Sequence, residues 1–147
     1  MAIEKTYVAH PSLVGGGEIT LHSHAGGGGL ATYSVENEAD DSSSSTSWQS
    51  KLVYTVVEAG DYIVQWYFEL YGSNISYHCC SQVLHNSAQL GNVQWESEDI
   101  NPAPWQSGGG LKKLTLAVND TIEIQYCSEN SSGIAHIRYA RIFLVKL

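Results

Sequence analysis

The sequence predicts an all-β protein built as an antiparallel sandwich or barrel of about eight to ten strands. Three observations lead to this fold class. Stretches of alternating apolar and polar residues occur throughout the chain, turn-forming residues separate them at fairly regular spacing, and helical periodicity is nearly absent. The chain has 147 residues, of which 43% are hydrophobic and 15% charged, so it has enough apolar material for one core.

The predicted strands follow one another with turns or loops between them. The polar, acidic and serine-rich stretch 36–47 is expected to be an exposed loop. The stretch 101–110 is also predicted to be a loop, because Pro102 and Pro104 cannot donate to a central sheet ladder. Strands are predicted at 18–24, 30–36, 48–57, 62–71, 75–85, 92–98, 111–118, 121–129 and 134–147.

Two pairs of successive strands are predicted to form hairpins. Residues 48–57 and 62–71 flank the turn sequence Glu-Ala-Gly-Asp, and residues 111–118 and 121–129 flank an Asn-Asp turn. The last strand, 134–147, is rich in apolar residues, and we expect it in the middle of a sheet.

The strand 62–71 has two different faces. One face is apolar and the other mixes polar and aromatic residues, which suits contact with another subunit or a second layer. Several aromatic residues exceed what one sandwich core needs, which favours an interface between copies of the chain: Tyr67, Tyr71, Tyr77, Trp95 and Trp105. The alternative is that all of these side chains fill a single core.

Two long stretches, 48–73 and 111–147, carry a family signature. In the first, a strand passes through Ala59-Gly60-Asp61 into an aromatic-rich strand; in the second, spaced Leu and Ile residues surround Asp120, and an apolar strand ends the chain. Together they resemble the globular head shared by complement-type and tumour-necrosis-factor-like proteins. The resemblance implies a jelly-roll sandwich and a compact homotrimer around a threefold axis.

This sequence departs from the family pattern at two places. The usual glycine of the second turn is Asn119 here, although asparagine tolerates left-handed geometry. The usual phenylalanine near the end is replaced by Arg141 or falls at Phe143, depending on the alignment. The sequence therefore predicts a divergent jelly roll. Residues 41–147 are assigned to that domain, and residues 1–40 to one or more N-terminal strands with a glycine-rich collar, continuous with the sandwich or leading into it.

The collar contains His22 and His24, which point the same way if the strand is extended. The segment around them resembles bacteriophage tail-fibre and adhesin segments in which His-x-His precedes glycines. That resemblance implies an axial iron held by three chains, and six imidazoles form an octahedral nitrogen shell suited to Fe(II) or Ni(II). In a second interpretation the two histidines are simply polar residues on a solvent face.

A third interpretation is a cupin-like metal enzyme, because Gly16 and the His-x-His pair match the start of that family's motif. The glutamate expected next is replaced by glycine at 26–29, and the second half of the motif is missing. A mononuclear centre needs three or four ligands from one chain. The candidates for the third ligand are His78, His85 and His136.

A saccharide site is the other candidate for ligand binding. Indole rings stack on the C–H faces of sugars, and neighbouring carboxylates bind hydroxyl groups. The residues that fit this chemistry are Trp48, Trp95, Trp105, Glu96 and Asp99. In the alternative interpretation the tryptophans close the ends of the sandwich. The three acidic residues at 96–99 are neighbours on one segment, so the facing carboxylates of a glycosidase are not indicated.

The three cysteines, Cys79, Cys80 and Cys127, are an odd number with an adjacent pair, which does not indicate a disulfide framework. We expect small buried thiols, with one of the adjacent pair in the core and the other pointing outward.

Charge and segment composition exclude several partners. The net charge of −8 and the lack of a basic cluster argue against nucleic acid, and no stretch is long and apolar enough for a membrane helix. No signal peptide is visible at the start. The resemblances to jelly-roll heads and to phage tail-fibre segments imply a non-enzymatic virion protein assembled in the host cytoplasm: a homotrimeric phage fibre-tip, receptor-binding or decoration module that contacts other virion proteins or a host-surface glycan. The alternatives are the cupin-like enzyme and a ligand-like head domain with a protein partner.

Overall fold

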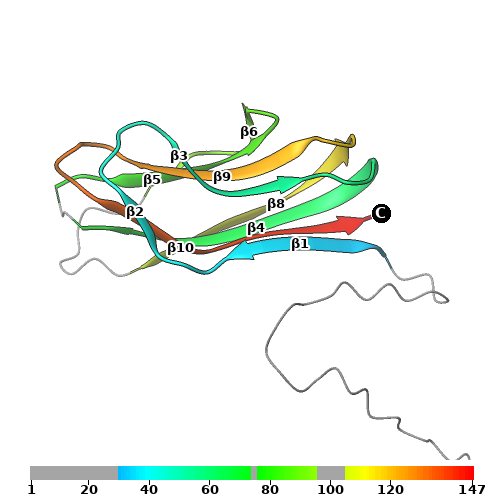
Figure 1. The fold of residues 1–147 in the computed structure, drawn as a ribbon, viewed down its shortest axis with the longest axis horizontal. Helices are drawn as coiled ribbons and strands as arrows, with labels where there is room; N and C mark the ends of the chain where they lie inside the picture. Colours follow the sequence, from blue (N-terminus) through cyan, green and yellow to red (C-terminus); the bar gives the residue numbers. More distant parts are fainter. Residues whose placement is uncertain (1–29, 74–75, 96–104) are drawn as a thin grey trace, which may run out of the picture.

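The computed structural model describes residues 30–73, 76–95 and 105–147, which form two antiparallel sheets packed face to face (Figure 1). The predicted all-β sandwich is confirmed, with ten strands in the described residues. No segment of this part of the chain forms a helix that could cross a membrane.

Each sheet has five strands. Sheet A has the order β1 (Thr32–Asn37), β10 (Ala135–Lys146), β4 (Gly60–Gly72) and β8 (Gln106–Leu116), with β2 (Asp41–Ser43) also paired to β10. Sheet B has the order β3 (Gln49–Thr55), β9 (Thr121–Ser128), β5 (Cys79–His85) and β6 (Ala88–Gln89), with β7 (Gln94–Trp95) also paired to β5. The final strand, β10, lies between β1 and β4, so its predicted central position is confirmed.

The core lies between the two sheets and is built mainly by the alternation of side chains along the strands. On β4, every second side chain points inward and is at most 9% exposed: Tyr62, Val64, Trp66, Phe68 and Leu70. Ile122 and Ile124 of β9 and Ile142 and Leu144 of β10 are fully buried against them. The face predicted to be apolar is therefore the core face, because successive side chains of a strand point to opposite sides.

Both predicted hairpins are wrong. β3 pairs with β9 in sheet B while β4 pairs with β10 and β8 in sheet A, so the chain changes sheets at residues 56–59, the first crossing. It changes sheets again between β8 and β9 at residues 117–120, the second crossing. The alternation of apolar and polar residues cannot distinguish the two arrangements, because a hairpin and a crossing bury the same faces of the four strands.

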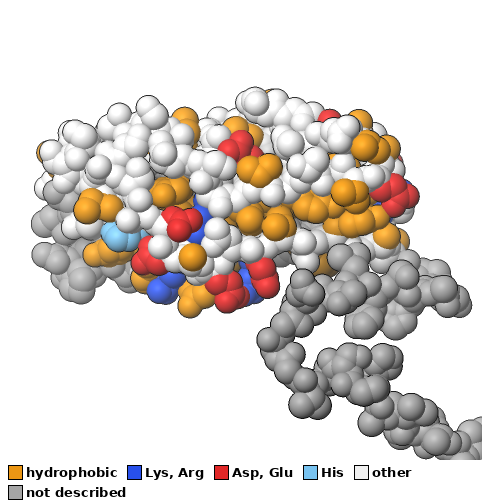
Figure 2. All heavy atoms as spheres, in the orientation of Figure 1, with side chains coloured by type: hydrophobic (Ala, Val, Ile, Leu, Met, Phe, Trp, Pro, Cys, Tyr) orange, Lys and Arg blue, Asp and Glu red, His pale blue; other side chains and the backbone are white. Residues whose placement is uncertain are grey.

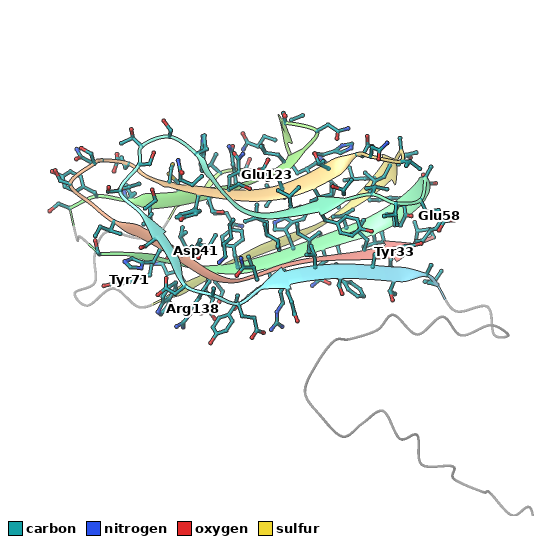
Figure 3. All side chains as sticks on the ribbon, in the orientation of Figure 1. Tyr33, Asp41, Glu58, Tyr71, Glu123 and Arg138 are labelled. Carbon is teal, nitrogen blue, oxygen red and sulfur yellow. The ribbon has the colours of Figure 1, made fainter. Side chains whose placement is uncertain are left out.

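Backbone hydrogen bonds connect the first crossing to the second. The amide of Val56 donates to the carbonyl of Asp120 at 2.8 Å, and the amide of Asn119 donates to the carbonyl of Val56 at 2.8 Å. Asn119 takes a φ of 71°, the left-handed conformation expected from its place in the turn. At the same end, Glu58 accepts hydrogen bonds from Lys146 and Tyr33, which lower the pKa of its carboxyl group (Figure 3).

The carboxylate of Asp120 closes the second crossing. It accepts the amide of Ala117 at 2.9 Å and the side-chain amide of Asn86 at 2.7 Å, and it contacts Nε2 of His85 at 3.0 Å. These contacts lower the pKa of the Asp120 carboxyl group to about 2, and the hydrogen bond from the Ala117 amide has the largest effect. The turn after β5 and the second crossing are therefore fixed to each other.

Two segments predicted to be loops contain strands. In the acidic and serine-rich stretch, β1 continues to Asn37 and β2 pairs with β10. The glycines at 108–110 lie in β8 opposite β4, with Gly108 paired to Phe68 and Gly110 to Trp66. A Cβ atom on Gly108 would lie 2.3 Å from the Phe68 ring, so these glycines leave room for the core aromatics.

Candidate functional site

The two outer faces of the sandwich differ in chemistry. On the outer side of sheet B, the central strands β5 and β9 carry the Gln82 and Gln125 amides, which are hydrogen-bonded across the strands at 2.9 Å, and the buried side chains of Cys80 and Cys127. The outer face of sheet A combines aromatic and apolar side chains with several polar and charged ones. We define it by these residues: Ile63, Gln65, Tyr67, Glu69 and Tyr71 of β4, Leu111 of β8, and Arg138, Tyr139, Arg141, Phe143 and Val145 of β10. Leu111, Phe143 and Tyr139 are 63%, 39% and 36% exposed.

A β-bulge in β10 shapes this face. Arg138 is opposite Glu69 and Arg141 is opposite Tyr67, so β10 carries one residue more than β4 between these two pairs. Tyr139 takes a φ of 50°, an uncommon conformation for an aromatic residue. The bulge keeps the next residue, Ala140, in the core and lets Tyr139 line the outer side.

A hollow of about 570 Å³ lies in the outer face of sheet A. Within it, the Tyr67 hydroxyl donates to Oε1 of Glu69 at 2.9 Å and lies 3.1 Å from the Ser107 hydroxyl. Arg138 donates through Nε to Oε2 of Glu69 at 2.8 Å. Both oxygens of Glu69 are thus held by this chain. The residues that line the hollow are Gln65, Trp66, Tyr67, Glu69, Tyr139, Arg141 and Phe143.

An aromatic and cationic cluster borders the hollow at the start of β8. The Arg138 guanidinium lies 3.9 Å from the centre of the Trp105 ring and 4.9 Å from that of Tyr139. Tyr71 contacts both Trp105 and His136, with ring centres 5.5 Å and 5.2 Å apart. Figure 3 shows Tyr71 and Arg138 near the end of the sandwich where β2 lies. The cluster fixes these rings by stacking and by cation–π attraction.

The acidic side chains of residues 36–41 are paired with basic groups, whereas the sequence alone predicted a solvated loop. Arg141 contacts Glu36 at 3.4 Å and Glu38 at 2.7 Å, and His136 contacts Asp40 at 3.3 Å. Figure 2 shows the acidic and basic side chains gathered at the side of sheet A where β1 and β2 pair with β10. These carboxylates therefore form ion pairs with basic side chains of β10 beside the outer face of sheet A.

Lys51 reaches this edge from the opposite sheet. Its side chain is fully buried, and its Nζ contacts Asp41 at 2.8 Å, the carbonyl of Ala39 at 2.7 Å and the side chain of Asn37 at 3.2 Å. A buried ammonium group needs such acceptors. Lys51 therefore fastens the segment between β1 and β2 to sheet B.

Comparison with known proteins identifies the fold. No family model and no curated protein matches the chain. Among solved structures, Eiger, a TNF from S. frugiperda, is 12% identical, with 81% of this chain and 93% of that chain covered and a TM-score of 0.55. A likeness at so low an identity shows the fold alone, and the predicted jelly-roll sandwich is confirmed.

Two further structures are similar. Dimeric latent PorU from Porphyromonas gingivalis is 5% identical, with a TM-score of 0.52; the match covers 80% of this chain and 13% of PorU. The globular domain of the zebrafish complement 1qA protein is 13% identical, with a TM-score of 0.49; the match covers 79% of this chain and 95% of that domain.

The structure places only part of the predicted saccharide set. Trp105 is half-buried in the cluster with Arg138, and Trp48, which is 37% exposed, precedes β3 of sheet B. Trp48 and Trp105 thus precede strands of different sheets, β3 and β8. Trp95 lies in β7, paired with Cys80, but its side chain is outside the described part, as are Glu96 and Asp99.

The predicted metal ligands His22 and His24 also lie outside the described residues. Within the described ranges, no three His, Cys, Asp or Glu side chains gather into a group that could hold a metal ion. His85 contacts Asp120 in sheet B, whereas His136 contacts Asp40 beside sheet A.

The sequence did not single out Arg138, Tyr139 or Arg141 as site residues. These three side chains lie on one face because of the bulge, and the local alternation of residues in β10 does not indicate an extra residue. The outer residues of β4 were found, because the period of two alone assigns them to one face.

Proposed function

We propose that this chain is a non-enzymatic head module that works as a homotrimer, with the outer face of sheet A as the contact between copies. The observation that carries the proposal is the difference between the two outer faces. Leu111, Phe143 and Tyr139 expose large apolar groups on sheet A, next to the half-buried Ile63 and Val145. Large apolar side chains exposed together on one face indicate an interaction site.

A second copy is the occupant that this surface fits. The face carries both signs of charge beside β1 and β2, with Arg141 next to Glu36 and Glu38, so it can meet charges of either sign on a neighbouring copy. The family resemblance supports three copies around one axis, as does the TNF-like fold. The hollow lined by Tyr67, Tyr139 and Phe143 would receive a side chain of the neighbouring copy.

Light scattering coupled to size-exclusion chromatography tests the assembly on the full chain. The protomer mass is 16.0 kDa, so a trimer has a mass three times larger, about 48 kDa. We expect Phe143→Lys to run as a monomer. Val53→Lys is the matched control, because Val53 is 46% exposed, lies on the outer face of sheet B and is paired with Glu123; it should stay trimeric. A monomeric wild-type protein would refute the proposal.

The biological setting we propose is a virion, in which the trimer is a phage fibre-tip, receptor-binding or decoration module assembled in the host cytoplasm and bound to other virion proteins.

A host-surface glycan is the proposed ligand. Trp48 supports it, since it is the most exposed tryptophan among those whose side chains are described. One face of Trp105 is already covered by Arg138. A glycan array with the wild type and Trp48→Ala tests this: binding should be lost in the variant, and a trimer that binds nothing on the array would contradict the glycan role.

An axial iron or nickel ion held by His22 and His24 of three chains is the proposed cofactor. Two imidazoles per chain suit the nitrogen shell of such an ion. Metal analysis of the purified trimer should give one ion per three chains, and His22→Ala with His24→Ala should abolish it. One ion per chain would instead support the cupin-like enzyme.

A further inference from the structure

Two of the three cysteines lie face to face on neighbouring strands. Cys80 of β5 and Cys127 of β9 are directly opposite each other in the antiparallel register, and their Sγ atoms are 3.0 Å apart. Both point to the outer side of sheet B, because the neighbouring Cys79 and Tyr126 point into the core. The expectation that Cys79 and Cys80 face opposite sides is therefore confirmed, and all three cysteine side chains are buried.

We infer that Cys80 and Cys127 are the site of a cross-strand disulfide, which forms when the chain meets a small-molecule disulfide such as oxidised glutathione. Directly opposite residues of an antiparallel pair have Cα atoms about 4.5–5.5 Å apart, which is within the range that a disulfide spans. The two sulfur atoms need to approach by about 1 Å to reach bonding distance. No change of register is required.

The geometry also decides which cysteine pairs with Cys127. Cys79 is paired with Ser128 and lies in the core, on the other side of the sheet from Cys127. Adjacent residues of a strand point to opposite faces, so Cys79 cannot reach Cys127 without a slip of the strand by one residue. The fold therefore selects one pairing from the three that the cysteines allow.

The reaction is a thiol–disulfide exchange in two steps. The thiolate of one cysteine attacks the small disulfide, forms a mixed disulfide and releases one small thiolate. The thiolate of the second cysteine then attacks the protein sulfur of the mixed disulfide, forms the Cys80–Cys127 bond and releases the second small thiolate. The two thiol protons pass to solvent, and the small disulfide is reduced by the two electrons that the protein loses.

Burial controls when this reaction occurs. Cys80 and Cys127 are 3% and 5% exposed, and burial raises the pKa of both thiols, so little thiolate meets an oxidant in the folded state. The bond therefore forms during folding or when β5 and β9 open. Once formed, it is shielded from reductants in the same way.

The bridge would join strands that are far apart in sequence. The two cysteines are separated by 47 positions, and the closed loop contains β6, β7 and β8. Closing a loop of this length removes much of the freedom of the unfolded chain. We expect the oxidised protein to melt about 10 °C above the reduced protein.

Mass spectrometry on the full chain tests the inference. The reduced protein is refolded from urea with oxidised glutathione, denatured in the presence of N-ethylmaleimide and weighed intact. We expect one label instead of three, together with the loss of two hydrogen masses. A protein that refolds with three labels, carries only glutathione adducts or runs as a disulfide-linked dimer would overturn the inference.

Single-cysteine variants locate the bond, with the number of labelled cysteines as the main readout. Cys79→Ser is the matched control: it removes the neighbouring thiol, and we expect it to lose both remaining labelling sites on oxidation. Cys80→Ser and Cys127→Ser should each keep two labelled cysteines, with no gain in melting temperature on oxidation. Circular dichroism checks that each variant has folded. A bond that survives Cys80→Ser through Cys79 would refute the assigned pair.

Discussion

Replacing Gly110 by alanine tests whether the glycines of β8 serve to accommodate the core aromatics. A Cβ atom at this position would lie 2.4 Å from Cζ2 and 2.7 Å from Cε2 of Trp66. Carbon atoms in favourable contact are about 3.5–4.0 Å apart, so the indole would have to move by about 1 Å. Trp66 is 9% exposed and belongs to the core, so this movement disturbs its neighbours.

The magnitude follows from two opposing effects. Overpacking of a core costs about 1–3 kcal/mol, whereas alanine in place of glycine reduces the freedom of the unfolded chain and stabilises by about 0.4–1 kcal/mol. We expect Gly110→Ala to lower the free energy of unfolding by about 1–2 kcal/mol. Urea unfolding followed by circular dichroism measures this change, with all proteins at the same protomer concentration because assembly contributes to stability.

A second variant identifies the contact responsible. Trp66→Phe removes the fused ring that carries Cζ2, and alone it destabilises the core by leaving a cavity. When Gly110→Ala and Trp66→Phe are combined, the new methyl group occupies part of the cavity that the smaller ring leaves. The double variant should therefore lose at least about 1 kcal/mol less than the sum of the two single changes. Losses that add to within about 0.5 kcal/mol would refute the reasoning, since residues out of contact behave additively.

Two other predictions concern polar contacts. The pKa of Asp120 is lowered to about 2 in the folded state, below its usual value of 3.8, so the stability it contributes is present above the usual value and is lost as the pH falls towards 2. Asp120→Asn should therefore lower the urea midpoint at pH 7, and the difference from the wild type should shrink between pH 4 and pH 2; a difference independent of pH would contradict this. Lys51→Met keeps the buried stem but cannot donate to the segment between β1 and β2, so amide hydrogen exchange should become faster at residues 37–43 and remain unchanged in β4. Unchanged exchange at 37–43 would show that Lys51 does not fasten this segment.

The faces of the strands could be predicted from the sequence because a strand has one periodicity. Alternation in residues 62–71 placed Trp66 and Phe68 in the core and Tyr67 on the outside, and the structure confirms it. Alternation contains no information about the partner of a strand. The short links at 56–59 and 117–120 look like hairpin turns, but each passes from one sheet to the other.

The remaining differences come from contacts between distant residues. Gly108 and Gly110 indicate a loop when read locally, and they belong to a strand only because Phe68 and Trp66 supply the side chains on the neighbouring strand. The cluster around Arg138 depends on a bulge that no local pattern reveals. The pairing of Cys80 with Cys127 could not be predicted locally either, because the register of β5 and β9 brings these distant residues together.

The central place of β10 has a consequence for synthesis of the protein. This strand joins β1, β2 and β4, yet it is the last strand of the sandwich to leave the ribosome. Until it emerges, β1 and β4 expose backbone groups that β10 will later pair, and such unpaired edges recruit strands from other chains. Nascent or truncated chains that lack β10 thus depend on rapid completion, or on a chaperone that covers these edges, to avoid aggregation.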